Sequence, residues 1–228
     1  MNLTIIGTSH IAKQSINEIK TAINENKPDI VAVELDLQRA STLMSEERSK
    51  ISIRDILKIG VKGYLFVKIG QYVQQKLGKM VGIAPGSEMK TALKLAHQNK
   101  LQVALIDQPI QITLKNFSKN LTWKEKFRFV GDFFKGIFFR KKQLKELGLD
   151  NFDLTKVPEE EVIEKMIGQL KKRYPNLYKT LITDRNKYMV KKLVRLLRSN
   201  PDKKILCIVG AGHKKGMEKL LLKVDVVR

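Results

Sequence analysis

Short apolar runs alternate with amphipathic segments from the start of the chain. The run LTII at 3–6 is typical of a short buried strand, and DIVAVELD at 29–36 is a second run rich in Val and Ile. Between them, residues 12–26 form one apolar helical stripe, made of Ile16, Ile19, Ala22 and Ile23. Strand, helix and strand follow one another within about 35 residues, which indicates a βαβ unit with parallel strands.

The same alternation returns later in the chain. Pro85-Gly86 indicates a turn, and Ser87 can cap the helix that follows. Further strands are expected at QVALIDQP (102–109), KILCIVGAG (204–212) and VDVV (224–227), and helical patterns cover 37–83, 118–146, 158–198 and 213–223. The apolar strand runs predict an α/β fold with a mainly parallel central sheet flanked by helices, together with a helical basic insertion. We expect a single domain whose α/β core comprises residues 1–36, 84–115 and 200–228, with helical insertions at 37–83 and 116–199.

The charge of the chain narrows the classes of partner. The 228 residues include 44 Lys and Arg against 23 Asp and Glu, a net charge of +21. Such a field attracts nucleic acid or anionic lipid, but no nucleic-acid-binding motif accompanies it, so we expect no nucleic-acid partner. The single cysteine, Cys207, lies in an apolar run, which favours a buried core residue and excludes an internal disulfide framework.

No basic leader precedes the first apolar run, and no run approaches the ~18 apolar residues of a membrane-spanning helix. We therefore expect a cytoplasmic protein, with the inner face of the membrane as an alternative peripheral location.

A basic amphipathic helix is predicted at 123–139. Its apolar face is aromatic and comprises Trp123, Phe127, Val130, Phe134, Ile137 and Phe138. The opposite face carries Lys124, Arg128, Asp132 and Lys135. Such a helix can lie on an anionic membrane or bind a partner groove. It can equally pack on the sheet or on another helix, or form a homodimer interface.

Two segments with the pattern Gly-x-x-His end two of the predicted strands. One is Gly7-Thr8-Ser9-His10 and the other is Gly210-Ala211-Gly212-His213. The carboxyl ends of parallel strands gather at one edge of a sheet, where the chemistry of α/β folds is found. We therefore expect His10 and His213 near the carboxylates that end other strands, Glu34, Asp36 and Asp107.

These residues support two interpretations. Imidazoles and carboxylates are ligands for a divalent metal that assists hydrolysis, and Glu88 can supply a further carboxylate. Arg39 and Arg185 can stabilise an oxyanion, or simply pair with Glu34 and Asp184. Alternatively, each histidine only bonds locally at the start of a helix.

The pattern Gly210-x-Gly212-x-x-x-Gly216 is close to a dinucleotide fingerprint. The chain ends at Arg228, before the acidic residue about 20 positions on that would bind a ribose, so we expect no dinucleotide cofactor.

Six motifs in order resemble the TraB/PrgY family of pheromone-shutdown proteins, which is related to the Tiki metalloproteases. They are GTSH at 7–10, VAVELDLQR at 31–39, PGSEM at 85–89, LIDQPIQITL at 105–114, DRNKYM at 184–189 and VGAGHKKG at 209–216. One departure is Asp184-Arg185, where Glu-Arg is usual in the family. Many PrgY-like members also carry C-terminal membrane-spanning helices. The residues up to Arg228 include none, so we expect either a short member or part of a longer protein.

The resemblance implies a divalent-metal-dependent peptidase that uses manganese or cobalt, with zinc as an alternative. By the same resemblance, His10 and His213 match the two family histidines, and Glu34 or Glu88 matches the essential glutamate. Arg39 and Arg185 match the arginines of the family motifs. The expected substrate is a peptide, such as a signalling peptide. A non-catalytic protein that sequesters a peptide, or an adaptor at a membrane face, is the alternative.

Overall fold

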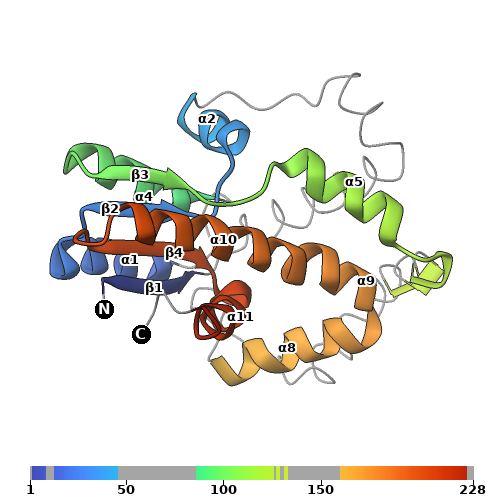
Figure 1. Cartoon of the computed structure of the whole chain (residues 1–228). Helices are drawn as coiled ribbons and strands as arrows, with labels where there is room; N and C mark the ends of the chain where they lie inside the picture. Colours follow the sequence, from blue (N-terminus) through green and yellow to red (C-terminus); the bar gives the residue numbers. More distant parts are fainter. Residues whose placement is uncertain are drawn as a thin grey trace.

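Four parallel strands form the centre of the protein (Figure 1). The computed structural model describes residues 2–8, 13–45, 86–125, 127–128, 131–132 and 160–224. The strands are β1 (Leu3–Thr8), β2 (Ile30–Val33), β3 (Gln102–Leu105) and β4 (Ile205–Gly210), in the order β1-β4-β2-β3. The predicted α/β class and the parallel sheet are therefore confirmed.

The last of the described strands, β4, lies inside the sheet. It pairs with β1 along six residues, from Leu3 opposite Ile205 to Thr8 opposite Gly210. On its other side it pairs with β2, which in turn pairs with β3. Because β4 has a neighbour on both sides, all six of its residues are buried, as its unbroken apolar sequence predicts.

Helices cover both faces of the sheet. On one face, α1 (Lys13–Asn26) and α4 (Ser87–Gln98) pack on the side chains of Val31, Val33, Leu206 and Ile208. On the other, α10 (Asp184–Ser199) and α11 (Ala211–Leu221) pack on Ile30, Ala32, Ile205, Cys207 and Val209. The alternation follows from the two-residue period of a strand, which sends successive side chains to opposite faces.

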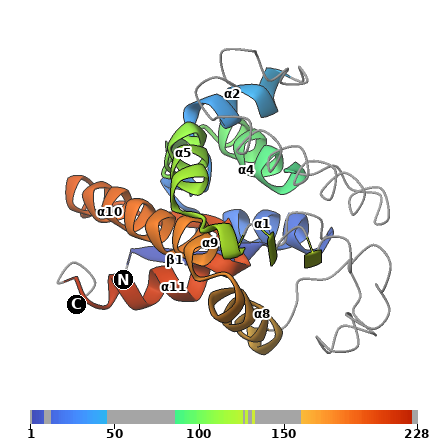
Figure 2. The same cartoon turned by 90° about the vertical axis from the view of Figure 1, so that its right-hand side faces the viewer.

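A group of helices extends beyond the carboxyl edge of the sheet. It contains α5 (Ile110–Asn120), α8 (Glu160–Arg173) and α9 (Pro175–Tyr178), which pack around Phe117, Leu121, Tyr174 and Leu177. A π-helical turn, η1 (Lys179–Thr183), leads from α9 into α10. Figure 2 shows α8 beside α11, and α2 (Leu37–Ser45) near α4 and α5.

Several predicted features fall partly or wholly outside the described residues. They are His10, the predicted helical pattern after Ser45 as far as residue 83, most of the helix at 123–139, and the terminal strand beyond Val224. Within the described part, α10 lies in the range expected as an insertion, yet it packs directly on the sheet. No described helix is both long enough and apolar enough to cross a bilayer.

Candidate functional site

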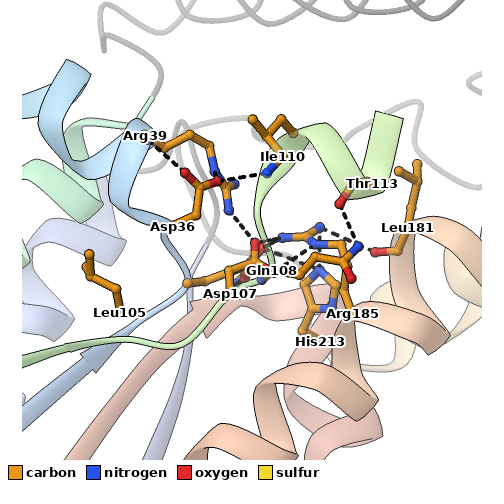
Figure 3. A network of polar contacts seen from close by, with 12 residues as sticks. Asp36, Arg39, Leu105, Asp107, Gln108, Ile110, Thr113, Leu181, Arg185 and His213 are labelled. Carbon is orange, nitrogen blue, oxygen red and sulfur yellow. Dashed lines mark hydrogen bonds and ion pairs between the residues drawn. The ribbon is translucent and has the colours of Figure 1, made fainter. Parts of the chain in front are cut away.

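Polar side chains converge at the carboxyl edge of the sheet (Figure 3). Glu34 follows β2 directly, and Asp107 lies two residues after β3. The first turn of α10 supplies Arg185 from one side, and the first turn of α11 supplies His213. Four elements far apart in the sequence therefore meet at one point, as the positions of the strand ends predict.

The guanidinium of Arg185 is the centre of this cluster. Its Nη2 donates to Glu34 and, at 2.6 Å, to Asp107, and its Nε donates to Asp107 at 3.2 Å. Its Nη1 contacts the carbonyl oxygen of Leu181 at 3.3 Å and His213 Nε2 at 3.1 Å. All five N–H donors of a guanidinium are thus engaged. Burial alone would lower the pKa of Arg185, but Glu34 and Asp107 raise it, so the side chain stays charged.

Glu34 connects the cluster to the backbone of the sheet. One carboxylate oxygen, Oε1, binds Arg185, while Oε2 accepts the backbone N–H of Gly210 at 2.6 Å. The side chain is buried, and both of its oxygens have partners. This arrangement satisfies the charge that burial would otherwise make unfavourable.

The imidazole of His213 lies between two polar neighbours. Its Nδ1 is 2.6 Å from Asn186 Oδ1, and its Nε2 faces Arg185. Glu34 Oε1 is 3.4 Å from the same Nε2. His213 and Asn186 are both buried, so the protein sets these contacts.

A second arginine binds the same aspartate from the solvent side. Arg39 Nη2 binds Asp107, and Arg39 Nε donates to Asp36 at 2.7 Å. Asp36 also accepts the backbone N–H groups of Arg39 and Ile110, which fixes the starts of α2 and α5. Arg39 is 31% exposed and Arg185 only 14%. Arg39 is therefore the cation of the pair that can reach a ligand.

The structure brings five of the seven predicted site residues into one network: Glu34, Arg39, Asp107, Arg185 and His213. Glu88 is buried in the first turn of α4, but it is not one of the groups bonded to Arg185. His10 lies outside the described residues. The expected ion pairs are exchanged: Arg39 binds Asp36 and Asp107, and Glu34 pairs with Arg185. Asp184, the expected partner of Arg185, pairs with Lys179 instead.

The contacts of these side chains decide whether the described residues could bind a metal ion. Among the described residues, no group of three His, Cys, Asp or Glu side chains could hold a metal ion. The Arg185 guanidinium contacts Glu34, Asp107 and His213 and is itself the positive charge between them. In this arrangement the described donors do not form a metal site. The predicted site would need His10.

Sequence reasoning missed Asn186, and it placed Asp36 at the strand end beside Glu34 without giving it a role. Both lie inside motifs, Asn186 directly after Arg185 and Asp36 between Glu34 and Arg39. The signal was their position beside charged residues at an element end, where short polar side chains bond to neighbouring groups.

Comparison with known proteins places these observations in a family. The sequence profile of the TraB/PrgY/gumN family matches residues 2–224. The uncharacterized protein MJ1365 of Methanocaldococcus jannaschii is 33% identical over 229 residues, which is 98% of this chain and 54% of that protein. The TraB domain-containing proteins of Mus musculus and Homo sapiens are each 25% identical over 243 residues, or 94% of this chain and 61% of theirs. The chain thus spans about half to three fifths of the length of these relatives.

Proposed function

Because the chain belongs to the TraB/PrgY/gumN family, we propose that it is a hydrolase that cleaves an amide bond of a peptide at the carboxyl edge of its sheet. One observation carries this proposal. A buried carboxylate, Glu34, and a buried imidazole, His213, lie 3.4 Å apart beside two arginines. Bases and cations held together in this way are suited to acyl transfer to water.

The residues divide the reaction between them. Glu34 accepts a proton from water while the water oxygen bonds to the amide carbon, because the single lone pair of His213 Nε2 already accepts from Arg185. The resulting oxyanion needs a hydrogen-bond donor. Arg39 Nη1 makes no hydrogen bond with any described residue, whereas the donors of Arg185 are engaged. The proton then passes to the amine nitrogen as the carbon–nitrogen bond breaks. Arg39 is thus the candidate for oxyanion stabilisation, and Arg185 positions Glu34 and His213.

A divalent metal is a separate part of the proposal. The resemblance suggests manganese, cobalt or zinc, which when bound would polarise the amide and lower the pKa of a bound water. Arg185 lies among the described donors, so such a metal would require His10 beside His213 and the opening of the contact between His213 and Arg185.

A peptide library tests the hydrolase. The purified protein is incubated with the library, with and without manganese, cobalt and zinc, and new peptide termini are sought by mass spectrometry. Glu34→Gln should reduce cleavage at least ~100-fold if Glu34 is the base. Asp184→Asn is the matched control, because Asp184 pairs with Lys179 outside the cluster. Peptides that bind but remain intact under all conditions would overturn the proposal and leave sequestration.

One surface favours a second candidate, an adaptor at the inner face of a membrane. Trp123 and Phe127 are 61% and 71% exposed, and their rings stack with centroids 6.0 Å apart. Lys124 and Arg128 beside them are also exposed, whereas Glu125 turns inward and is buried. Exposed aromatic rings among cations suit an anionic lipid surface.

Flotation with vesicles containing phosphatidylglycerol tests this adaptor. Binding should fall with salt and should be lost when Trp123 and Phe127 are both replaced by alanine. Leu222→Ala, which removes an exposed apolar side chain elsewhere, is the control. Equal flotation of all three proteins, or no flotation, would contradict a role for this surface.

A further inference from the structure

We propose that Asn186 is the positioning residue of His213. It holds the imidazole in the tautomer with the proton on Nδ1, so that Nε2 accepts a hydrogen bond from Arg185. Gly216 provides the space that the Asn186 carboxamide occupies. The inference rests on the proposed function and deepens it, because it explains how His213 is oriented toward Arg185 and Glu34 in the proposed site.

The first step concerns Nε2. Arg185 Nη1 lies 3.1 Å away, and a guanidinium can only donate hydrogen bonds. Nε2 must therefore accept. Arg185 is bound through Nη2 and Nε to Glu34 and Asp107, so its Nη1 cannot turn away from the ring without losing those pairs.

The second step concerns Nδ1. A neutral imidazole that accepts at one nitrogen carries its proton on the other. That proton points at the atom 2.6 Å away, which is Asn186 Oδ1. The two contacts agree on one tautomer. Because Asn186 and His213 are both buried, bulk water cannot readily substitute for the acceptor if Asn186 is shortened.

The third step concerns Gly216. It follows His213 by three residues on α11, so both face the first turn of α10. A Cβ at Gly216 would lie within 3.0 Å of the Asn186 side-chain nitrogen, a separation that real Cβ atoms essentially never show. Glycine is unfavourable inside a helix, and here it leaves room for the carboxamide. The steric limit set by Asn186 thus explains why glycine occupies the last position of the pattern His-x-x-Gly, at Gly216.

The consequence is the orientation of the imidazole in the site. Nε2, not Nδ1, lies 3.4 Å from Glu34 Oε1 and faces the centre of the cluster. The opposite tautomer would place a proton against Arg185 and a lone pair against Asn186. It would also remove the acceptor that Arg185 Nη1 meets in the site.

Nitrogen NMR on 15N-histidine-labelled protein reads the tautomer directly. The chain has three histidines, and His213→Ala identifies the signal. We expect a bare Nε2 and a protonated Nδ1. Asn186→Asp, which keeps an acceptor, should retain this pattern. Asn186→Ala should give a mixture of tautomers, and kcat of any peptidase activity should fall about 10–100-fold with little change in KM.

The glycines of α11 supply a matched pair. Gly216→Ala should shift the His213 signal as Asn186→Ala does. Gly212→Ala should leave it in place, because a Cβ there meets only the Cδ1 methyl group of Ile167 at 3.3 Å. Circular dichroism would verify that each variant folds.

Two results would overturn the inference: a proton on Nε2 in the unmodified protein, or equal signals in the two glycine variants. Neither result depends on finding a substrate, so a failure of the hydrolase proposal is recognised separately by the peptide library.

Discussion

The carboxylate of Glu34 accepts the backbone N–H of Gly210 at 2.6 Å, which joins the ends of two neighbouring strands through one side chain. The same carboxylate binds Arg185 through its other oxygen. The position of Glu34 is therefore coupled to the start of α11, which carries His213. Several measurable consequences depend on this and on related contacts.

Glu34→Gln should lower the free energy of unfolding by about 2–3 kcal/mol. Both oxygens of Glu34 accept hydrogen bonds, and a glutamine offers one acceptor and one donor, so one buried N–H group is left unsatisfied. Urea unfolding followed by circular dichroism measures the change. Asp184→Asn, which breaks a more exposed ion pair, should cost at most about 1 kcal/mol. Equal losses in the two variants would contradict the arrangement at Glu34.

Arg185→Lys should destabilise the protein more than Arg39→Lys. Lysine has three donors on one nitrogen and cannot reproduce the five directed contacts of Arg185, whereas Arg39 uses fewer donors and is more exposed. We expect a difference of at least about 1 kcal/mol in urea unfolding. A larger loss in Arg39→Lys would show that Asp36 and Asp107 hold the site more strongly than Arg185 does.

Glu125 should make stability fall in acid. Burial raises its pKa, but hydrogen bonds from Asn176 and Thr122 outweigh this and lower it below the ordinary value. A group with a lowered pKa stabilises the folded state at neutral pH, and this contribution is lost as pH falls through the folded-state pKa. The stability difference between the unmodified protein and Glu125→Gln should therefore shrink below pH ~4. A constant difference down to pH ~2 would contradict it.

Cys207 should be inert in the folded protein. It lies in the middle of β4 with no exposed surface, and burial raises the pKa of its thiol. A thiol reagent such as DTNB should therefore react only after unfolding in urea. Because the chain has one cysteine, the rate reports a single site. Rapid reaction in buffer would mean that β4 opens readily.

Metal binding is predicted to depend on both Gly-x-x-His segments. Calorimetry on stripped protein with manganese, cobalt and zinc should show binding that His10→Ala and His213→Ala each abolish. His97→Ala, which alters an exposed histidine on α4, is the control. Binding that survives both site variants would place the metal elsewhere.

Much of this architecture follows from local patterns. Apolar runs such as that of β4 predict buried parallel strands, and the carboxyl ends of those strands predict that Glu34, Asp107 and His213 meet. The strand order was not predictable in this way, because a run that is buried on both faces does not reveal its neighbours.

Local sequence patterns also did not predict which side chains pair with one another. Arg185 binds Glu34 across 151 sequence positions, and nothing in the periodicity of α10 shows which carboxylates its first turn will meet. The apolar stripe of α10 likewise does not reveal that it packs on the sheet. The role of Asn186 became apparent only from its contact with His213 in the structure.

The place of β4 inside the sheet has a consequence for synthesis on the ribosome. Strands β1 and β2 are synthesised first, but neither can pair with β4 until residues 205–210 have been made. Until then both expose unpaired backbone edges, which are prone to association with other chains. The sheet can therefore be completed only after β4 has been made, and a chain that lacks β4 is expected to associate more readily than the whole domain.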